Sequence, residues 1–141
     1  AVLRKPSKLN DEEWAIMRQH PRIGYTILRE VDFLGRSLPV VLHHHEKWDG
    51  SGYPDGLAGE AIPLAARIFA AADAFDAITS PRPYKKAMPA PAALERIRQD
   101  CGTHFDPDVV AAFLPMGAQL IDAVSVTRPV RPIQRPVSKP Q

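Results

Sequence analysis

The chain has 141 residues, of which 45% are hydrophobic, so it is long enough for one globular domain with a core. No apolar run approaches the roughly 18 to 20 residues that a membrane helix needs, and no secretory signal pattern is visible. The single cysteine, Cys101, excludes an internal disulfide and fits a reducing compartment. The start on Ala1 in place of methionine indicates a fragment or a trimmed chain.

The net charge of +2 belongs to the C-terminal tail. From Arg128 onward, "RPVRPIQRPVSKPQ" holds four basic residues, four prolines and no acid, which leaves 14 basic and 16 acidic residues in the body. We therefore expect a helical domain over residues 1–126 and a basic, proline-rich, disordered tail over residues 127–141. The tail could contact nucleic acid or an acidic partner, but we favour a solvated terminus, and the body offers no basic surface for DNA.

The first predicted helix begins after Asn10, a candidate N-cap. Glu13 stands three residues later, at the capping-box position, and acids fill the first turn. His20 precedes Pro21, and a residue before proline is biased out of the helical region, so we expect His20 to end this helix. Pro21 can then open a second helix at its first position.

Further helices follow in chain order, separated by one long loop. A third helix is expected over "RSLPVVLHHHE", residues 36–46, before a glycine- and proline-rich loop at 47–63 that is long enough to be functional. Helices are then expected over 64–78, over 90–100 and from Pro107 onward, with Asp106 as the last cap. The pattern predicts an all-α domain.

Asp73 and Asp76 are anomalous in the helix at 64–78, where Arg67 is the only other residue that is not apolar. A helix that is apolar nearly all round should be buried, and a buried carboxylate must be paired, hydrogen-bonded or bound to a metal. The alternative is that one aspartate caps or bridges a neighbouring helix, and the spacing alone favours neither interpretation.

Three histidines, His43, His44 and His45, precede the loop directly. Consecutive residues of a helix point about 100° apart, so at most two of them can serve one site. Histidine with carboxylate is a ligand set of zinc, iron and manganese. A solvated histidine cluster is an equal alternative, and His20 could approach the same point.

Cations and aromatic rings flank these residues. Arg82, Lys85 and Lys86 would suit a phosphate ligand beside a metal, although taken alone they favour a solvated loop. Tyr53 and Trp48 could stack on a base, or could anchor the loop to the body.

The segment "HHEKWDGSGYPDGLAGEAIPLAARIFAAADAFDAITSPRPYKKA", residues 44–87, resembles the signature region of the HD-GYP family. These proteins are bacterial cyclic di-GMP phosphodiesterases among the wider HD hydrolases, and the match extends over residues 3 to 114. The resemblance implies an all-α bundle of the HD-domain type with a long loop, and two or three divalent metal ions: iron or manganese first, with zinc, nickel or cobalt as alternatives. It also implies cyclic di-GMP as substrate, a cytoplasmic location, and diguanylate cyclase or other signalling domains as partners.

The same resemblance assigns the site residues. His20, His44, His45 and Asp73 match metal ligands, whereas His43 falls outside the motif. Tyr53, Arg82 and Lys85 match positions that contact the nucleotide or its phosphate. Metal-activated water would then hydrolyse the phosphodiester bond.

One departure concerns the His-Asp pair from which the family takes its first name. No His-Asp dipeptide occurs in this sequence, so the domain is expected to be N-terminally incomplete and, as this chain alone, weak or inactive. The alternative is a degenerate cyclic di-GMP-binding or protein-interaction module without catalysis.

Overall fold

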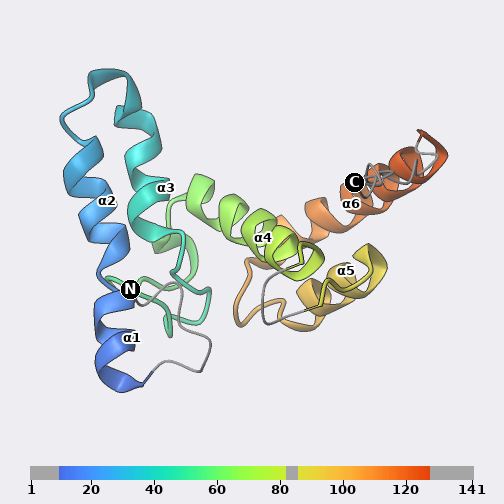
Figure 1. The fold of residues 1–141 in the computed structure, drawn as a ribbon, viewed down its shortest axis with the longest axis horizontal. Coiled ribbons are helices and arrows are strands. Elements are labelled where there is room, and N and C mark those ends of the chain that lie inside the picture. The colour runs from blue at the N-terminus through green and yellow to red at the C-terminus, as the bar shows by residue number, and fades with distance from the viewer. Residues whose placement is uncertain (1–9, 82–85, 128–141) are drawn as a thin grey trace, which may run out of the picture.

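The computed structural model describes residues 10–81 and 86–127. Within these ranges the chain forms α-helices, two short 3-10 helices and no β-strand, so the predicted all-α class is confirmed. The elements, drawn in Figure 1, are α1 (Asp11–Met17), α2 (His20–Leu28), η2 (Asp32–Ser37), α3 (Leu38–His43), η3 (Gly59–Ala61), α4 (Leu64–Thr79), α5 (Ala90–Gln99) and α6 (Pro107–Thr127).

Helix α1 begins at the predicted cap. Asn10 Oδ1 accepts a hydrogen bond from the Glu13 amide, and the Glu13 carboxylate accepts one from the Asn10 amide, both at 2.9 Å. The prediction that His20 ends this helix is wrong, because α1 ends at Met17 and His20 is the first residue of α2. The first turn of a helix does not use its N–H groups, so Pro21 fits there and α2 can start one residue before it.

Helices α2 and α3 lie side by side in opposite directions and form an arm of the molecule (Figure 1). Gly24 lies at their contact, where an added Cβ would stand 3.2 Å from Cγ1 of Val41. An alanine at this position would therefore require the Val41 side chain to shift by a few tenths of an ångström. This packing brings the start of α2 close to the end of α3, although the two points are more than twenty residues apart in sequence.

Helix α4 runs across the middle of the molecule and contacts α3, α5 and α6 (Figure 1). The main core lies where α4, α5 and α6 meet and is built from Ala71, Ile97, Phe105, Val109 and Val110. At the start of α6, the predicted cap is present: Asp106 Oδ1 accepts a hydrogen bond from the Asp108 amide at 2.8 Å, and its other oxygen pairs with Arg67 Nη1 at 2.6 Å.

The expectation that α4 is buried nearly all round is wrong. Only Ala66 and Ala71 are buried on it, whereas Leu64 and Ile68 are about half exposed, at 55% and 49%. Both Asp73 and Asp76 are exposed as well, so neither carboxylate carries the desolvation cost that the pattern suggested. Asp76 accepts a hydrogen bond from the Ser80 hydroxyl at 3.0 Å, at the end of its own helix.

No helix within the described ranges is both long and apolar enough to cross a bilayer. The predicted domain boundary at residue 126 falls at the end of α6, and residues 128–141 of the predicted tail lie outside the described residues.

Candidate metal centre

Three histidine side chains converge between the start of α2 and the end of α3. His20 Nε2 lies 3.2 Å from His45 Nε2 and 3.5 Å from His44 Nε2, and one ligand nitrogen from each ring lies within 4.8 Å of the others. We name these three residues the histidine cluster. The structure therefore brings together His20, His44 and His45, as the proposed ligand set requires.

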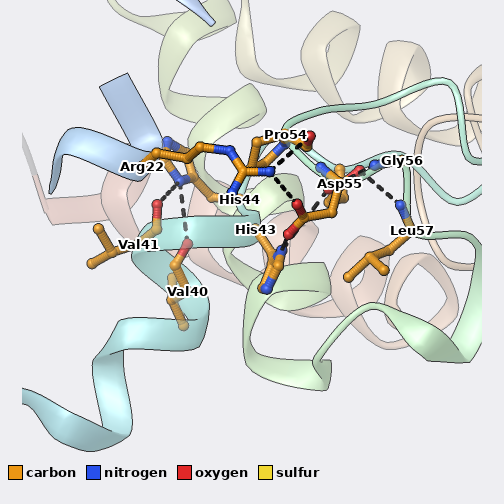
Figure 2. Close-up of polar contacts among 10 residues, drawn as sticks. Arg22, Val40, Val41, His43, His44, Pro54, Asp55, Gly56 and Leu57 are labelled. Atoms are coloured by element: carbon orange, nitrogen blue, oxygen red, sulfur yellow. Dashed lines mark hydrogen bonds and ion pairs between the residues drawn. The ribbon is translucent and has the colours of Figure 1, made fainter. Parts of the chain in front are cut away.

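Backbone carbonyls define the proton positions of two of these rings. His20 Nδ1 lies 2.7 Å from the Met17 carbonyl oxygen, and His44 Nδ1 lies 2.9 Å from that of Val41. The contacts of His44 with Val40 and Val41 are drawn in Figure 2. A carbonyl oxygen can only accept, so Nδ1 must carry the proton in each ring and Nε2 must present its lone pair to the cluster. Metal-binding histidines are commonly held in this way.

The third ring is held neutral by its surroundings. Burial, together with the neighbouring rings of His44 and His20, lowers the pKa of His45 from 6.5 to about 4. A neutral imidazole is the form that binds metal. At neutral pH, His45 therefore needs no proton removed before it can act as a ligand.

The spacing of the cluster fits a transition-metal ion. Nitrogen ligands about 2.1 Å from a tetrahedral or octahedral cation lie roughly 3.0 to 3.4 Å from one another. The measured Nε2 separations of 3.2 and 3.5 Å are close to that range. Without a cation or a proton between them, facing lone pairs at this distance repel each other, so the donor set suits a divalent metal.

His43 points away from this cluster toward two carboxylates. Its Nδ1 lies 3.6 Å from Asp55 Oδ2 and 3.9 Å from Glu46 Oε1, and this buried nitrogen has no hydrogen-bond partner among the described residues. At most two of the three consecutive histidines were expected at one site, and in the structure those two are His44 and His45.

Glu46 is a functional residue that the sequence argument did not identify. Its side chain is fully buried, and its carboxylate accepts hydrogen bonds from the amides of Asp55, Gly56 and Leu57 at 2.7, 3.1 and 3.1 Å. Each bond is made to a charged acceptor, which strengthens it. Glu46 thus holds the turn after Tyr53 against the residues that follow the histidines, and we name this set of bonds the Glu46 clamp.

Two further contacts bring the loop close to the cluster. An added Cβ at Gly52 would lie 2.4 Å from the Lys47 nitrogen and 2.5 Å from Glu46 Cα, so only glycine fits there. Arg22, two residues after His20, pairs with Asp55 and hydrogen-bonds the Pro54 carbonyl oxygen at 3.4 Å, as Figure 2 shows. The loop is therefore in contact with α2 and with the segment that follows α3, which together carry the histidine cluster.

Tyr53 and Trp48 have different surroundings. The Tyr53 ring stacks on His45, with ring centroids 4.8 Å apart, and its amide donates to the His45 carbonyl oxygen at 3.2 Å. Burial raises the pKa of the Tyr53 hydroxyl. Trp48 lies beside Arg67, and its amide donates to the His104 carbonyl oxygen at 3.1 Å. Trp48 thus anchors the loop to the body, whereas Tyr53 lies at the cluster.

The remaining predicted site residues are not brought into the cluster. Asp73 is exposed on α4, four residues after Phe69, whose ring packs edge-on against His44 with centroids 5.8 Å apart. It does not belong to the group of converging ligand atoms in the described part of the chain. Arg82 and Lys85 lie outside the described residues. The ligand role of Asp73 and the phosphate contacts of Arg82 and Lys85 stay predictions.

Comparisons with known proteins identify the family of the chain. The HD domain family matches residues 1–109. The chain is 52% identical over 122 residues to the cyclic di-GMP phosphodiesterase response regulator RpfG of Xanthomonas campestris pv. campestris (strain 8004), covering 85% of this chain and 32% of that protein. It is 40% identical over 116 residues to the 3'3'-cGAMP-specific phosphodiesterase 2 of Vibrio cholerae, covering 81% and 22%.

A solved structure shares the fold. The crystal structure of a cyclic GMP-AMP specific phosphodiesterase of V. cholerae matches with a TM-score of 0.59 and 26% identity, covering 81% of this chain and 25% of that chain. The chain thus spans about a fifth to a third of the length of these relatives. The matched family covers most of the sequence, including the histidine cluster and the loop, and the chain belongs to the HD domain family.

Proposed function

We propose that this chain forms part of a metal-dependent phosphodiesterase that hydrolyses a cyclic dinucleotide, with cyclic di-GMP as substrate. The observation that supports the proposal best is the convergence of three Nε2 atoms beside the loop that carries Tyr53. Phosphodiester hydrolysis needs a cation to neutralise phosphate charge and rings or cations to hold the nucleotide. The histidine cluster and Tyr53 supply the groups for both tasks within one small region.

The chain's own residues would hold the metal and orient the nucleotide. His20, His44 and His45 would bind a divalent ion, iron or manganese first, through neutral Nε2 atoms. Such an ion supplies water activation and charge neutralisation when it is bound. Tyr53 would contact the nucleotide, with the Glu46 clamp keeping the loop against His45. Arg82 and Lys85 would bind the substrate phosphate, and Asp73 would add a carboxylate ligand.

The choice of cyclic di-GMP rests on relatives. Cyclic di-GMP stands in the name of the relative with 52% identity, and 3'3'-cGAMP in that of a relative with 40% identity. Turnover by this chain alone, which was expected to be weak or absent, stays a prediction. So do a cytoplasmic location and partnership with diguanylate cyclase or other signalling domains.

The competing function is a cyclic di-GMP-binding or interaction module without catalysis. One observation favours it: the histidine cluster consists of three nitrogens and no carboxylate, while the carboxylates of Glu46 and Asp55 converge with His43 in a separate group. Polymetal hydrolytic centres need further ligands to hold a second ion. Such a module would bind the dinucleotide without cleaving it.

Metal content measured beside turnover tests the proposal. The protein is loaded with Mn²⁺ or Fe²⁺, and bound metal and cyclic di-GMP hydrolysis are measured for the unaltered chain, for His20→Ala, His44→Ala and His45→Ala, and for His43→Gln as the matched control. We expect the three cluster variants to lose metal and His43→Gln to keep it. Unchanged metal content in the cluster variants would contradict the ligand assignment. Dinucleotide binding without hydrolysis at full metal loading would favour the binding module if it is found for a chain extended upstream of Ala1 as well as for this one.

A further inference from the structure

Arg67 is a largely buried cation to which the proposed site assigns no role. It lies near the start of α4, and its side chain is only 16% exposed. Its Nη1 donates to Asp106 Oδ2 at 2.6 Å, and the Asp106 side chain is almost fully buried. Burying an ion pair is costly because both charges lose their hydration, so the orientation that such a pair imposes explains it better than the stability that it adds.

The guanidinium of Arg67 also faces the loop. Its Cζ lies 5.8 Å from the centroid of the Trp48 ring, within the distance over which a cation is attracted to an aromatic face. Arg67 Nε is buried and has no hydrogen-bond partner among the described residues. The guanidinium thus contacts a carboxylate and an indole ring, and its rigid, planar shape suits it to hold both in a fixed arrangement.

The backbone of Trp48 is tied at the same place. Its amide donates to the His104 carbonyl oxygen at 3.1 Å, and its own carbonyl oxygen accepts from the Gly59 amide at 2.9 Å. His104 stands two residues before Asp106, which caps α6. The loop therefore meets α4 and the start of α6 at one point. We name the set of Arg67, Asp106 and Trp48 the loop joint.

The segment between the loop joint and the histidine cluster is short and closed. Trp48 stands three residues after His45, and the Tyr53 amide donates to the His45 carbonyl oxygen at 3.2 Å. At Gly52 the backbone lies so close to residues 46–47 that no Cβ would fit. Because the segment is closed by these contacts, a shift of Trp48 would displace His45 and Tyr53 with it.

We propose that Arg67 is a positioning residue of the phosphodiesterase site: held by Asp106, it fixes Trp48 and thereby the orientation of His45 toward the metal. The inference rests on the proposed function and goes beyond it, because it assigns a role to a residue outside the histidine cluster. Arg67 is also not a member of the apolar core. Replacing it by lysine keeps the charge beside Asp106 but removes the planar group that contacts Trp48.

Nuclear magnetic resonance of the metal-free protein tests this role without metal or substrate. Arg67→Lys should shift the ring resonances of His45 and the amide resonance of Tyr53. Arg98→Lys makes the same change in an exposed pair with Glu95 and should leave these resonances unchanged. Unshifted His45 and Tyr53 resonances in folded Arg67→Lys protein would overturn the proposal.

A second variant covers the case in which Arg67→Lys does not fold. Arg67→Gln combined with Asp106→Asn leaves no unpaired buried charge and removes the same planar cation. The same shifts at His45 and Tyr53 are expected in this double variant, and their absence would again overturn the proposal.

Mn²⁺ binding then shows whether Arg67 acts through Trp48. Arg67→Lys should weaken Mn²⁺ binding by roughly tenfold, the lower end of the range for groups that orient a metal ligand without binding the metal. Trp48→Leu should have a similar effect. Arg67→Lys combined with Trp48→Leu should bind no more weakly than Trp48→Leu alone, because both changes break the same contact. Losses that add in the combined variant would contradict action through Trp48.

The two proposals can fail separately. Shifted His45 resonances and weakened Mn²⁺ binding in a protein that hydrolyses no cyclic dinucleotide, also when it is extended upstream of Ala1, would support the loop joint and overturn the phosphodiesterase proposal. Metal-dependent hydrolysis in a protein whose His45 resonances and Mn²⁺ affinity do not respond to Arg67→Lys would overturn the positioning role alone.

Discussion

Residues 64–81 and 86–127 enclose an apolar core, whereas within residues 10–63 polar contacts around Glu46 hold the loop in place. In the first region, which we name the apolar half, Ile97, Phe105 and Val110 are buried between helices. In the second, the histidine half, one buried carboxylate binds three loop amides. The free energy gained by apolar burial depends on the total area that is buried, whereas the free energy of a buried polar group depends on each of its hydrogen bonds. Stability and site geometry are thus supported by different parts of the chain.

The largest expected effect lies in the apolar half. Ile97→Ala should reduce the free energy of unfolding by about 2 to 5 kcal/mol, because Ile97 is fully buried and its truncation leaves a cavity. Chemical denaturation measures this loss. Ile27→Ala, at a position that is 65% exposed, is the control and should change stability by no more than about 0.5 kcal/mol. Loss of bound metal from folded Ile97→Ala protein would show that the two halves are not independent.

The Glu46 clamp should give the next effect. Glu46→Ala removes the acceptor of three amides and should cost about 1 to 3 kcal/mol, with Glu46→Gln in between because an amide keeps one oxygen. Hydrogen exchange should speed up at Asp55, Gly56 and Leu57 before it changes in α5 or α6. Glu60→Ala, an exposed acid of the same loop, should leave these rates unchanged. Uniformly faster exchange across both halves would contradict a local clamp.

A pH titration of the metal-free protein should show a loss of stability in acid that arises from His45 in the histidine half and from His104 in the apolar half. Burial lowers the pKa values of His45 and His104 below 6.5 in the folded protein. As the pH falls, these histidines therefore bind protons in the unfolded chain before they do so in the folded protein. The folded protein loses no stability through these groups above about pH 6.5, and it loses stability progressively as the pH falls toward 4. Each proton contributes a slope of at most about 1.4 kcal/mol per pH unit. His104→Gln should reduce the measured slope, and an unchanged slope would exclude His104 as a source.

The smallest expected effect concerns the ion pair of Arg22 with Asp55. Both side chains are partly exposed, so Arg22→Ala should cost only about 0.2 to 1 kcal/mol and the cost should shrink at high salt. Arg29→Ala, which breaks the exposed pair with Glu30 far from the loop, is the matched control. Amide chemical shifts at Pro54 neighbours should move only in the Arg22 variant. Equal shifts in both variants would contradict a specific role of Arg22 in holding the loop.

Local features were predictable because they depend on neighbours in sequence. The Asn10 and Glu13 capping box and the Asp106 cap follow from short-range spacing, and both are present. The helical class follows in the same way from apolar periodicity and from the positions of proline and glycine. These signals are complete within one or two helical turns, so no knowledge of the tertiary structure was needed.

Long-range geometry was not predictable from periodicity. The approach of His20 to His45 depends on the packing of α2 against α3, and only the family resemblance selected these residues together. The exposure of α4 was missed because periodicity shows which faces could be buried, but not what covers them. One feature of the sequence could have predicted the Glu46 clamp. Consecutive amides in a glycine-rich turn need hydrogen-bond acceptors, and Glu46 is the carboxylate at the end of the helix predicted before the loop.

The position of Arg22 on α2 has a mechanical consequence. His20 and Arg22 are two residues apart, about 3 Å along the helix axis, yet one faces the histidine cluster and the other braces the loop tip. Sliding or rotating α2 would displace the His20 nitrogen of the histidine cluster and the Arg22 contacts to the loop in a single movement. The positions of the histidine cluster and of the loop are therefore coupled through α2, and a shift of this helix would change both.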